Sequence, residues 1–184
     1  ILINECRKLK IDVLPPDINV SNIHFQPIDD TSISFGMNAI KNVGAKALEF
    51  IIAARKKDGP FNSLFDFTSR VDLQAVNKKV LESLIVSGAM DHLEGSRAEK
   101  VSTIEIAIRY GQNIQSERDK NQVDLFDDSA SGSGVSLIPN LQEVRPWSDG
   151  EALANEKEVL GLYLTGHPLL EYADDLEDFS NHDF

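Results

Sequence analysis

Apolar residues recur at helical spacing after a turn built on Asn42 and Gly44. The residues on this single helical face are Val43, Ala47, Leu48, Ile51 and Ile52. The pattern predicts a helix that begins at Gly44 and packs against a short helix over residues 35–41. It should end at Asp58-Gly59-Pro60, because glycine caps helices well and proline cannot continue them. Two helices joined by such a turn form a helix-hairpin-helix unit.

A second, weaker unit of the same kind is predicted around Gly88. An apolar stripe over residues 80–85 ends at Ser87-Gly88-Ala89, and Ser96 then begins a helix that carries Val101, Ile104 and Ile108. Between the two units, Ser63 resembles a helix cap with Asp66 in the acidic position. Beyond Gly111 the apolar pattern decays into the polar stretch at residues 112–121.

The N-terminal part predicts a small β-structure, and the C-terminal part predicts one more helix. Residues 23–28 and 32–35 alternate around Asp29-Asp30-Thr31, which is typical of a short β-hairpin. Ser148 with Glu151 forms a capping-box pattern, and the stripe that follows predicts a helix ended by Gly166-His167-Pro168. The predicted fold class is therefore mainly α, a tandem helix-hairpin-helix domain with a small N-terminal β-hairpin.

The charge distribution changes how the net charge of -12 is interpreted. Residues 1–118 carry 15 Lys+Arg and 15 Asp+Glu, whereas residues 119–184 carry 3 and 15, so the acidic excess is entirely C-terminal. A neutral helical part remains compatible with nucleic acid, although charge groups are usually solvated helix faces. One cysteine, no signal peptide and no apolar run long enough for a bilayer predict a cytoplasmic protein with no membrane partner.

The hairpin turns are the candidate phosphate-binding sites. The first backbone N–H groups of a helix have no intrahelical partner and lie at the positive end of its dipole, so they bind anions. The DNA-binding candidates are Lys41, Asn42, Val43, Gly44, Ala45, Lys46, Gly88, Arg97 and Lys100. The alternative is that these turns are ordinary helix corners in a protein-protein scaffold that never contacts DNA.

A short peptide before a Gly/Ser-rich stretch is a candidate docking motif. It consists of Gln122, Val123, Asp124, Leu125 and Phe126. Its large apolar pair lies between charged sequence and the tether at residues 127–134, which is typical of a segment that orders in a partner's apolar pocket. Alternatively, Leu125 and Phe126 fold back on their own domain.

No pattern in this chain predicts catalysis, a metal site or a cofactor. The acidic cluster at residues 174–178 lies in a terminal tail without an apolar frame, so it is interpreted as solvated. The four histidines, His24, His92, His167 and His182, are too scattered for a zinc site. The prediction is therefore no catalytic residue, no metal and no cofactor in this chain.

Five separated blocks, in one order along the chain, resemble the alpha subunits of bacterial DNA polymerase III, the C-family replicative polymerases. The blocks are Glu5-Cys6-Arg7 through residues 14–19, Phe35-Gly36 through Val43-Gly44, residues 59–67, residues 88–91, and residues 160–169. Two positions depart from the family pattern. Asn42 stands where the first hairpin glycine is usual, and Leu48 replaces a small residue on the second helix. Asparagine tolerates left-handed backbone, so the turn can still form.

The resemblance implies both an organisation and a function. Residues 1–35 would be the end of the fingers with the β-hairpin, 36–118 the tandem helix-hairpin-helix domain, 119–146 the clamp-binding peptide and linker, and 147–184 a helix leading to an oligonucleotide-binding-fold domain. The chain would be an excerpt of a longer polymerase that holds duplex DNA and docks on the sliding clamp, the beta subunit, in support of processive template-directed synthesis. Other replisome subunits would meet the full-length parent. The catalytic carboxylates would lie upstream, so this chain alone is expected to be inactive.

Overall fold

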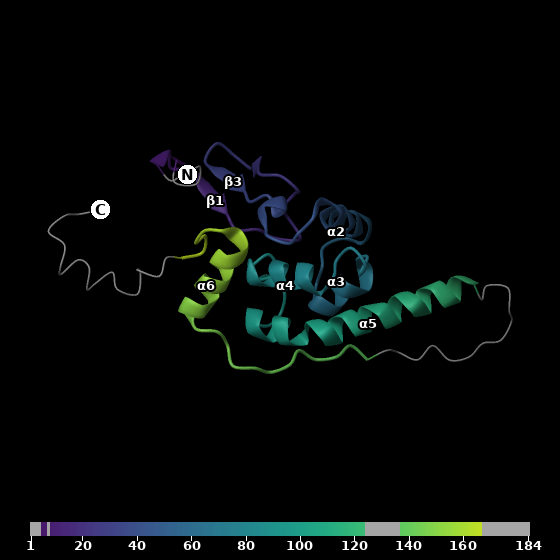
Figure 1. The fold of residues 1–184 in the computed structure, drawn as a ribbon. Coiled ribbons are helices and arrows are strands. Elements are labelled where there is room, and N and C mark those ends of the chain that lie inside the picture. The colour runs from purple at the N-terminus through teal and green to yellow at the C-terminus, as the bar shows by residue number, and fades with distance from the viewer. Residues whose placement is uncertain (1–4, 7, 124–136, 167–184) are drawn as a thin grey trace.

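The computed structural model describes residues 5–6, 8–123 and 137–166, and it is mainly helical with a small sheet near the N-terminus (Figure 1). The strands are β1 (Asp12–Leu14), β2 (Gln26–Pro27) and β3 (Ser32–Ser34). The helices are the 3-10 turn η1 (Met37–Ala39), α2 (Ala45–Asp58), α3 (Leu64–Arg70), α4 (Lys78–Val86), α5 (Arg97–Val123) and α6 (Asp149–Leu160). This architecture confirms the predicted fold class.

The sheet contains the predicted hairpin and one further strand. β2 and β3 pair antiparallel, with Gln26 opposite Ser34, which confirms the hairpin. β1 adds to the other edge of β3 in parallel, with Asp12 opposite Ser32, giving the order β1-β3-β2. The hairpin pattern did not predict this third strand. Parallel pairing between segments separated by a long connection leaves no local turn signal.

Helix α2 begins and ends where the sequence predicts. Gly44 precedes its first residue, and Gly59, with φ +82°, caps its C-terminus. The Ser63 side chain accepts a hydrogen bond from the Asp66 amide at 3.0 Å and so begins α3, which confirms that cap. No helix in the described part is both long and apolar enough to cross a bilayer.

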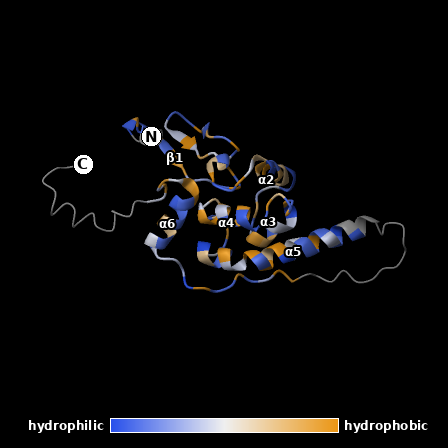
Figure 2. Cartoon of the chain, viewed as in Figure 1, coloured by the Kyte–Doolittle hydropathy of each residue, from blue (hydrophilic) through white to orange (hydrophobic). Residues whose placement is uncertain are grey.

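One apolar core joins all these helices, and Figure 2 shows hydrophobic residues alternating with hydrophilic ones along them. Its fully buried members include Leu48, Ile51, Phe67, Leu81, Leu84 and Ile104. Helices α3 and α5 cross closely: the rings of Phe65 and Tyr110 meet edge to face at 5.5 Å. At the same crossing Gly111 lies against the Thr68 backbone, where a Cβ atom would collide with the carbonyl group.

Helix α5 does not stop near Gly111, where the apolar pattern decays. It continues to Val123. Its second half contacts polar backbone groups rather than the core, because Gln115 donates to the carbonyls of Thr68 at 3.0 Å and Val71 at 2.9 Å. Arg118 donates to the Ser69 carbonyl at 3.2 Å. The apolar pattern therefore ends while the helix persists.

From residue 137 the chain runs back beside α5 toward α6 (Figure 1). The Gln142 amide donates to the Thr103 hydroxyl at 2.8 Å, which fixes this segment on α5. Ser148 and Glu151 form the reciprocal capping box predicted at the start of α6. The helix ends earlier than predicted, because Gly161 adopts a left-handed conformation with φ +76° and closes it.

Candidate nucleic-acid interface

The first hairpin turn connects η1 to α2 and is fixed by backbone hydrogen bonds. The Val43 amide donates to the Ile40 carbonyl at 3.2 Å, and the Val43 side chain is buried. This corrects one sequence prediction, because a committed Val43 amide cannot also bind a phosphate. Val43 anchors the turn, while Lys41, Asn42 and the residues from Gly44 to Lys46 are exposed around it.

Asn42 occupies the left-handed conformation that this turn requires. Its φ is +67°, a value that glycine adopts without cost and asparagine tolerates better than most residues. The Asn42 side-chain amide donates to the Ser83 hydroxyl of α4 at 3.1 Å. Asparagine therefore provides the turn conformation and also a hydrogen bond to the neighbouring helix. A glycine at this position would adopt the conformation but could not form that bond.

The N-terminus of α2 is open. Gly44 offers no side-chain cap, and the first turn of the helix carries no acidic residue. Within the described residues, the amides of Gly44, Ala45 and Lys46 have no hydrogen-bond partner. The flanking Lys41 and Lys46 ammonium groups form no ion pair in the part of the chain that the structure describes. Free amides, a helix dipole and two lysines together form a site suited to an anion.

The N-termini of the other described α-helices are occupied by side chains. Asn77 accepts amide hydrogen bonds at α4, and Glu151 closes the capping box at α6. At α5, the Glu99 carboxylate accepts from the Ser96 amide at 2.7 Å, and this bond lowers the pKa of Glu99. A phosphate that approached the N-terminus of α5 would be repelled by this carboxylate. The two hairpins therefore differ: the first is open to a phosphate and the second is closed.

Arg97, predicted to contact DNA from the second hairpin, is committed to protein groups. Its guanidinium donates to Asp91 at 2.5 to 3.1 Å, to the Val86 carbonyl at 3.2 Å and to Glu156 at 3.3 Å. Burial opposes its charge, yet the bonds to Asp91 and Glu156 outweigh burial and raise the pKa of Arg97. Gly88 has φ +84° and packs against this guanidinium, where a Cβ atom would collide with it.

Lys100 lies in the interior, which contradicts its predicted role as a phosphate ligand. Only 1% of the residue is exposed, and its Nζ donates to the Gly95 carbonyl at 2.7 Å. Burial lowers the pKa of Lys100. A lysine on the first turns of a predicted helix is normally solvated, so no pattern in the chain indicated this burial.

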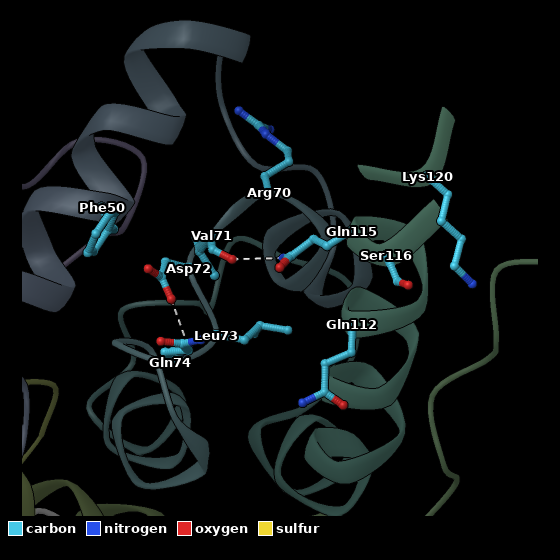
Figure 3. A pocket seen from close by; sticks show the side chains of 10 residues that line it. All are labelled: Phe50, Arg70, Val71, Asp72, Leu73, Gln74, Gln112, Gln115, Ser116 and Lys120. Atoms are coloured by element: carbon cyan, nitrogen blue, oxygen red, sulfur yellow. Dashed lines mark hydrogen bonds between the residues drawn. The ribbon is translucent and has the colours of Figure 1, made fainter. Parts of the chain in front are cut away.

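A groove of about 970 Å³ lies elsewhere, between α2 and the second half of α5 (Figure 3). Phe50 borders one side, and Gln112, Ser116 and Lys120 border the other. Arg70 also lines it, but its guanidinium donates to the carbonyls of Ala54, Gly59 and Pro60. Among the described lining residues, Lys120 is thus the single uncommitted cation, so the groove is less suited to a phosphate chain than the first hairpin.

The candidate docking peptide lies mostly outside the described residues. Gln122 and Val123 belong to the last turn of α5, and the described backbone stops there, before Asp124, Leu125 and Phe126. Figure 1 shows that this end of α5 extends past α3, away from α4 and α6. Within the described ranges, no group of three or more His, Cys, Asp or Glu side chains could hold a metal ion.

The comparisons with known proteins agree with this geometry. A helix-hairpin-helix motif model matches residues 10–100. The chain is 38% identical over 180 residues to DNA polymerase III subunit alpha of Vibrio cholerae, and 37% identical over 194 residues to that of Pseudomonas aeruginosa. It is 38% identical over 178 residues to the same subunit of Escherichia coli. These matches cover 97% to 98% of this chain, which spans only 15% to 16% of the length of the relatives.

Proposed function

We propose that this chain, which belongs to the DNA polymerase III alpha family, is the region that holds duplex DNA and docks on the sliding clamp. It contains no residue to which we assign catalysis. In the longer polymerase, both contacts would support processive template-directed synthesis in the bacterial cytoplasm, alongside the other replisome subunits.

The open N-terminus of α2 is the observation that carries the DNA contact. The free amides of Gly44, Ala45 and Lys46 would receive a backbone phosphate, and the ammonium groups of Lys41 and Lys46 would neutralise it and its neighbour. Such contacts read no base edges, so binding would be independent of DNA sequence. The acidic C-terminal residues need not oppose this contact, because the acidic excess begins beyond residue 118.

The composition of residues 122–126 supports the clamp contact. An apolar pair preceded by glutamine fits a partner's apolar pocket, since an extended or helical peptide buries a few anchors there. The end of α5 extends past the helices that form the core (Figure 1). A motif that follows this end could meet a partner without disturbing the core.

We expect weak duplex binding with a modest salt dependence, and weaker binding after charge reversal at Lys46. Two lysines that each neutralise a phosphate give a slope of log affinity against log salt of about -2, at about -0.9 per phosphate. Lys46→Glu should reduce the magnitude of this slope to about 1 or less. The measurement is a fluorescence-anisotropy titration of a labelled random-sequence duplex at several salt concentrations.

Lys57→Glu provides a matched control for that prediction. It reverses the same charge on the same helix, but at an exposed position near the C-terminus of α2. The control should change the slope by much less than Lys46→Glu. Equal effects of the two variants, or binding that does not respond to salt, would instead favour the alternative that the hairpins form a protein-protein scaffold.

A further inference from the structure

Helix α6 contacts the turns of both hairpins. Near its C-terminus the Val159 carbonyl accepts a hydrogen bond from the Lys41 amide at 2.9 Å, in the first hairpin turn. One turn earlier, Glu156 pairs with Arg97 of the second hairpin at 3.3 Å. A single helix is therefore bonded to two turns that lie far apart in the sequence.

Glu156 is a fully buried carboxylate with several donors. It accepts from the amides of Leu164 at 2.8 Å and Thr165 at 3.0 Å, from the Thr165 hydroxyl at 2.7 Å, and from Arg97. A buried carboxylate is costly unless such partners satisfy it, so these groups are held together tightly. The turn that follows α6 closes over this side chain.

Arg97 continues the connection into the second hairpin. Its guanidinium joins Glu156 to Asp91 in the turn and to the Val86 carbonyl at the end of α4. The Asn42 side chain of the first hairpin is bonded to Ser83 of the same helix α4. The first turn is thus fixed from two sides, by α6 and by α4.

We propose that Glu156 is a positioning residue for DNA binding: it anchors α6 to the second hairpin, and α6 in turn holds the first hairpin turn in the orientation that receives a phosphate. This inference rests on the proposed function. The second hairpin then contributes to DNA binding as the support of the first, through Arg97, rather than as a second phosphate site.

The direction in which one substitution changes DNA affinity distinguishes this positioning role from a purely electrostatic effect. Glu156→Gln removes a negative charge, which by itself would strengthen binding to a phosphate backbone. If Arg97 were a DNA ligand, its release from Glu156 would strengthen binding further and steepen the salt slope by about 0.9. A positioning role predicts weaker binding with an unchanged slope, because the lysine contacts are the same but the turn is less well held.

The experiment measures duplex affinity, salt slope and amide hydrogen exchange in the whole chain. Glu156→Gln places an amide among donors, and we expect about three- to tenfold weaker binding, the scale of one ordinary lost hydrogen bond. Exchange at the Lys41 amide should become faster. Glu158→Gln is the matched control, since Glu158 is exposed on the same helix and loses the same charge; it should bind DNA at least as tightly as the parent.

Thr165→Val keeps the test valid if Glu156→Gln unfolds the chain. It removes the hydroxyl group that donates a hydrogen bond to Glu156, and it changes no charge. It should also weaken DNA binding, by a smaller factor than Glu156→Gln. Unchanged or tighter binding in Glu156→Gln, with faster Lys41 exchange and a normal response to Lys46→Glu, would overturn the positioning role alone. If Lys46→Glu also leaves binding unchanged, the proposed DNA contact itself fails.

Discussion

Replacing Leu125 and Phe126 together with alanine should abolish binding to the sliding clamp and leave the fold intact. Docking of these two side chains in a preformed pocket removes them from water, at about 1.5 to 3 kcal/mol each. The ordering of the peptide opposes part of this gain, so the parent complex is expected to be micromolar. A loss of about 3 to 6 kcal/mol would raise a Kd of about 1 μM to between about 0.2 mM and tens of millimolar. Surface plasmon resonance against an immobilised bacterial clamp measures the change.

The chain offers a matched control for this double substitution on the other side of the linker. Leu137 and Ile138 are also an adjacent apolar pair, and they are 86% and 66% exposed. Their replacement by alanine should leave clamp binding unchanged. Retained clamp binding in the Leu125/Phe126 variant would contradict the clamp assignment. A large drop in its thermal midpoint would show instead that the pair packs in the fold, the alternative that the sequence left open.

Helix starts were predictable because they depend on neighbouring residues. Ser63, Ser148 and the Gly44 turn each act within one turn of the helix that they begin, and the structure confirms all three starts. The same local logic identified Gly59 as the end of α2. It placed the end of α6 too late, because Gly161 stops the helix while apolar residues continue after it.

The roles of the second hairpin's charged residues depend on tertiary contacts that the helical pattern does not indicate. Arg97 and Glu156 are 59 residues apart, and no local pattern pairs them. Lys100 is buried, and its Nζ donates to the Gly95 carbonyl in the loop before α5. The sequence analysis treated Arg97 and Lys100 as solvent-exposed and therefore as DNA-binding candidates. For the first hairpin it succeeded in part, because the exposure of Lys41 and Lys46 follows from their places beside the turn.

Gly111 shows how one residue supports two opposite interpretations. In the sequence, the apolar pattern decays after this glycine, and an isolated glycine usually weakens a helix. In the structure it lies inside α5, where the absence of a side chain lets the helix approach the Thr68 carbonyl of α3. The polar residues that follow extend beyond the core and bond to the carbonyls of Thr68 and Ser69, so a helix without an apolar face is stable there.

Gly111→Ala should therefore destabilise the chain, although helix propensity predicts the reverse. Alanine in a helix interior is favoured over glycine by about 1 kcal/mol. Here the new methyl group would overlap the Thr68 carbonyl, so α5 must move away from α3, which costs about 1 to 3 kcal/mol or more in a well-packed contact. We expect the steric term to be larger, with a thermal midpoint lower by about 2 to 4 °C for each kcal/mol of net loss. Differential scanning calorimetry measures the shift.

Gly150→Ala tests the same substitution where no contact opposes it. Gly150 lies in the first turn of α6, and a Cβ atom there would meet nothing within 4 Å. This variant should keep or slightly raise the thermal midpoint, because only helix propensity acts on it. Opposite shifts for the two glycines would establish that the close approach of α5 to α3 requires glycine at position 111. A rise in the midpoint of Gly111→Ala would show that the two helices can separate without cost, and the tight crossing would then contribute little to the stability of the fold.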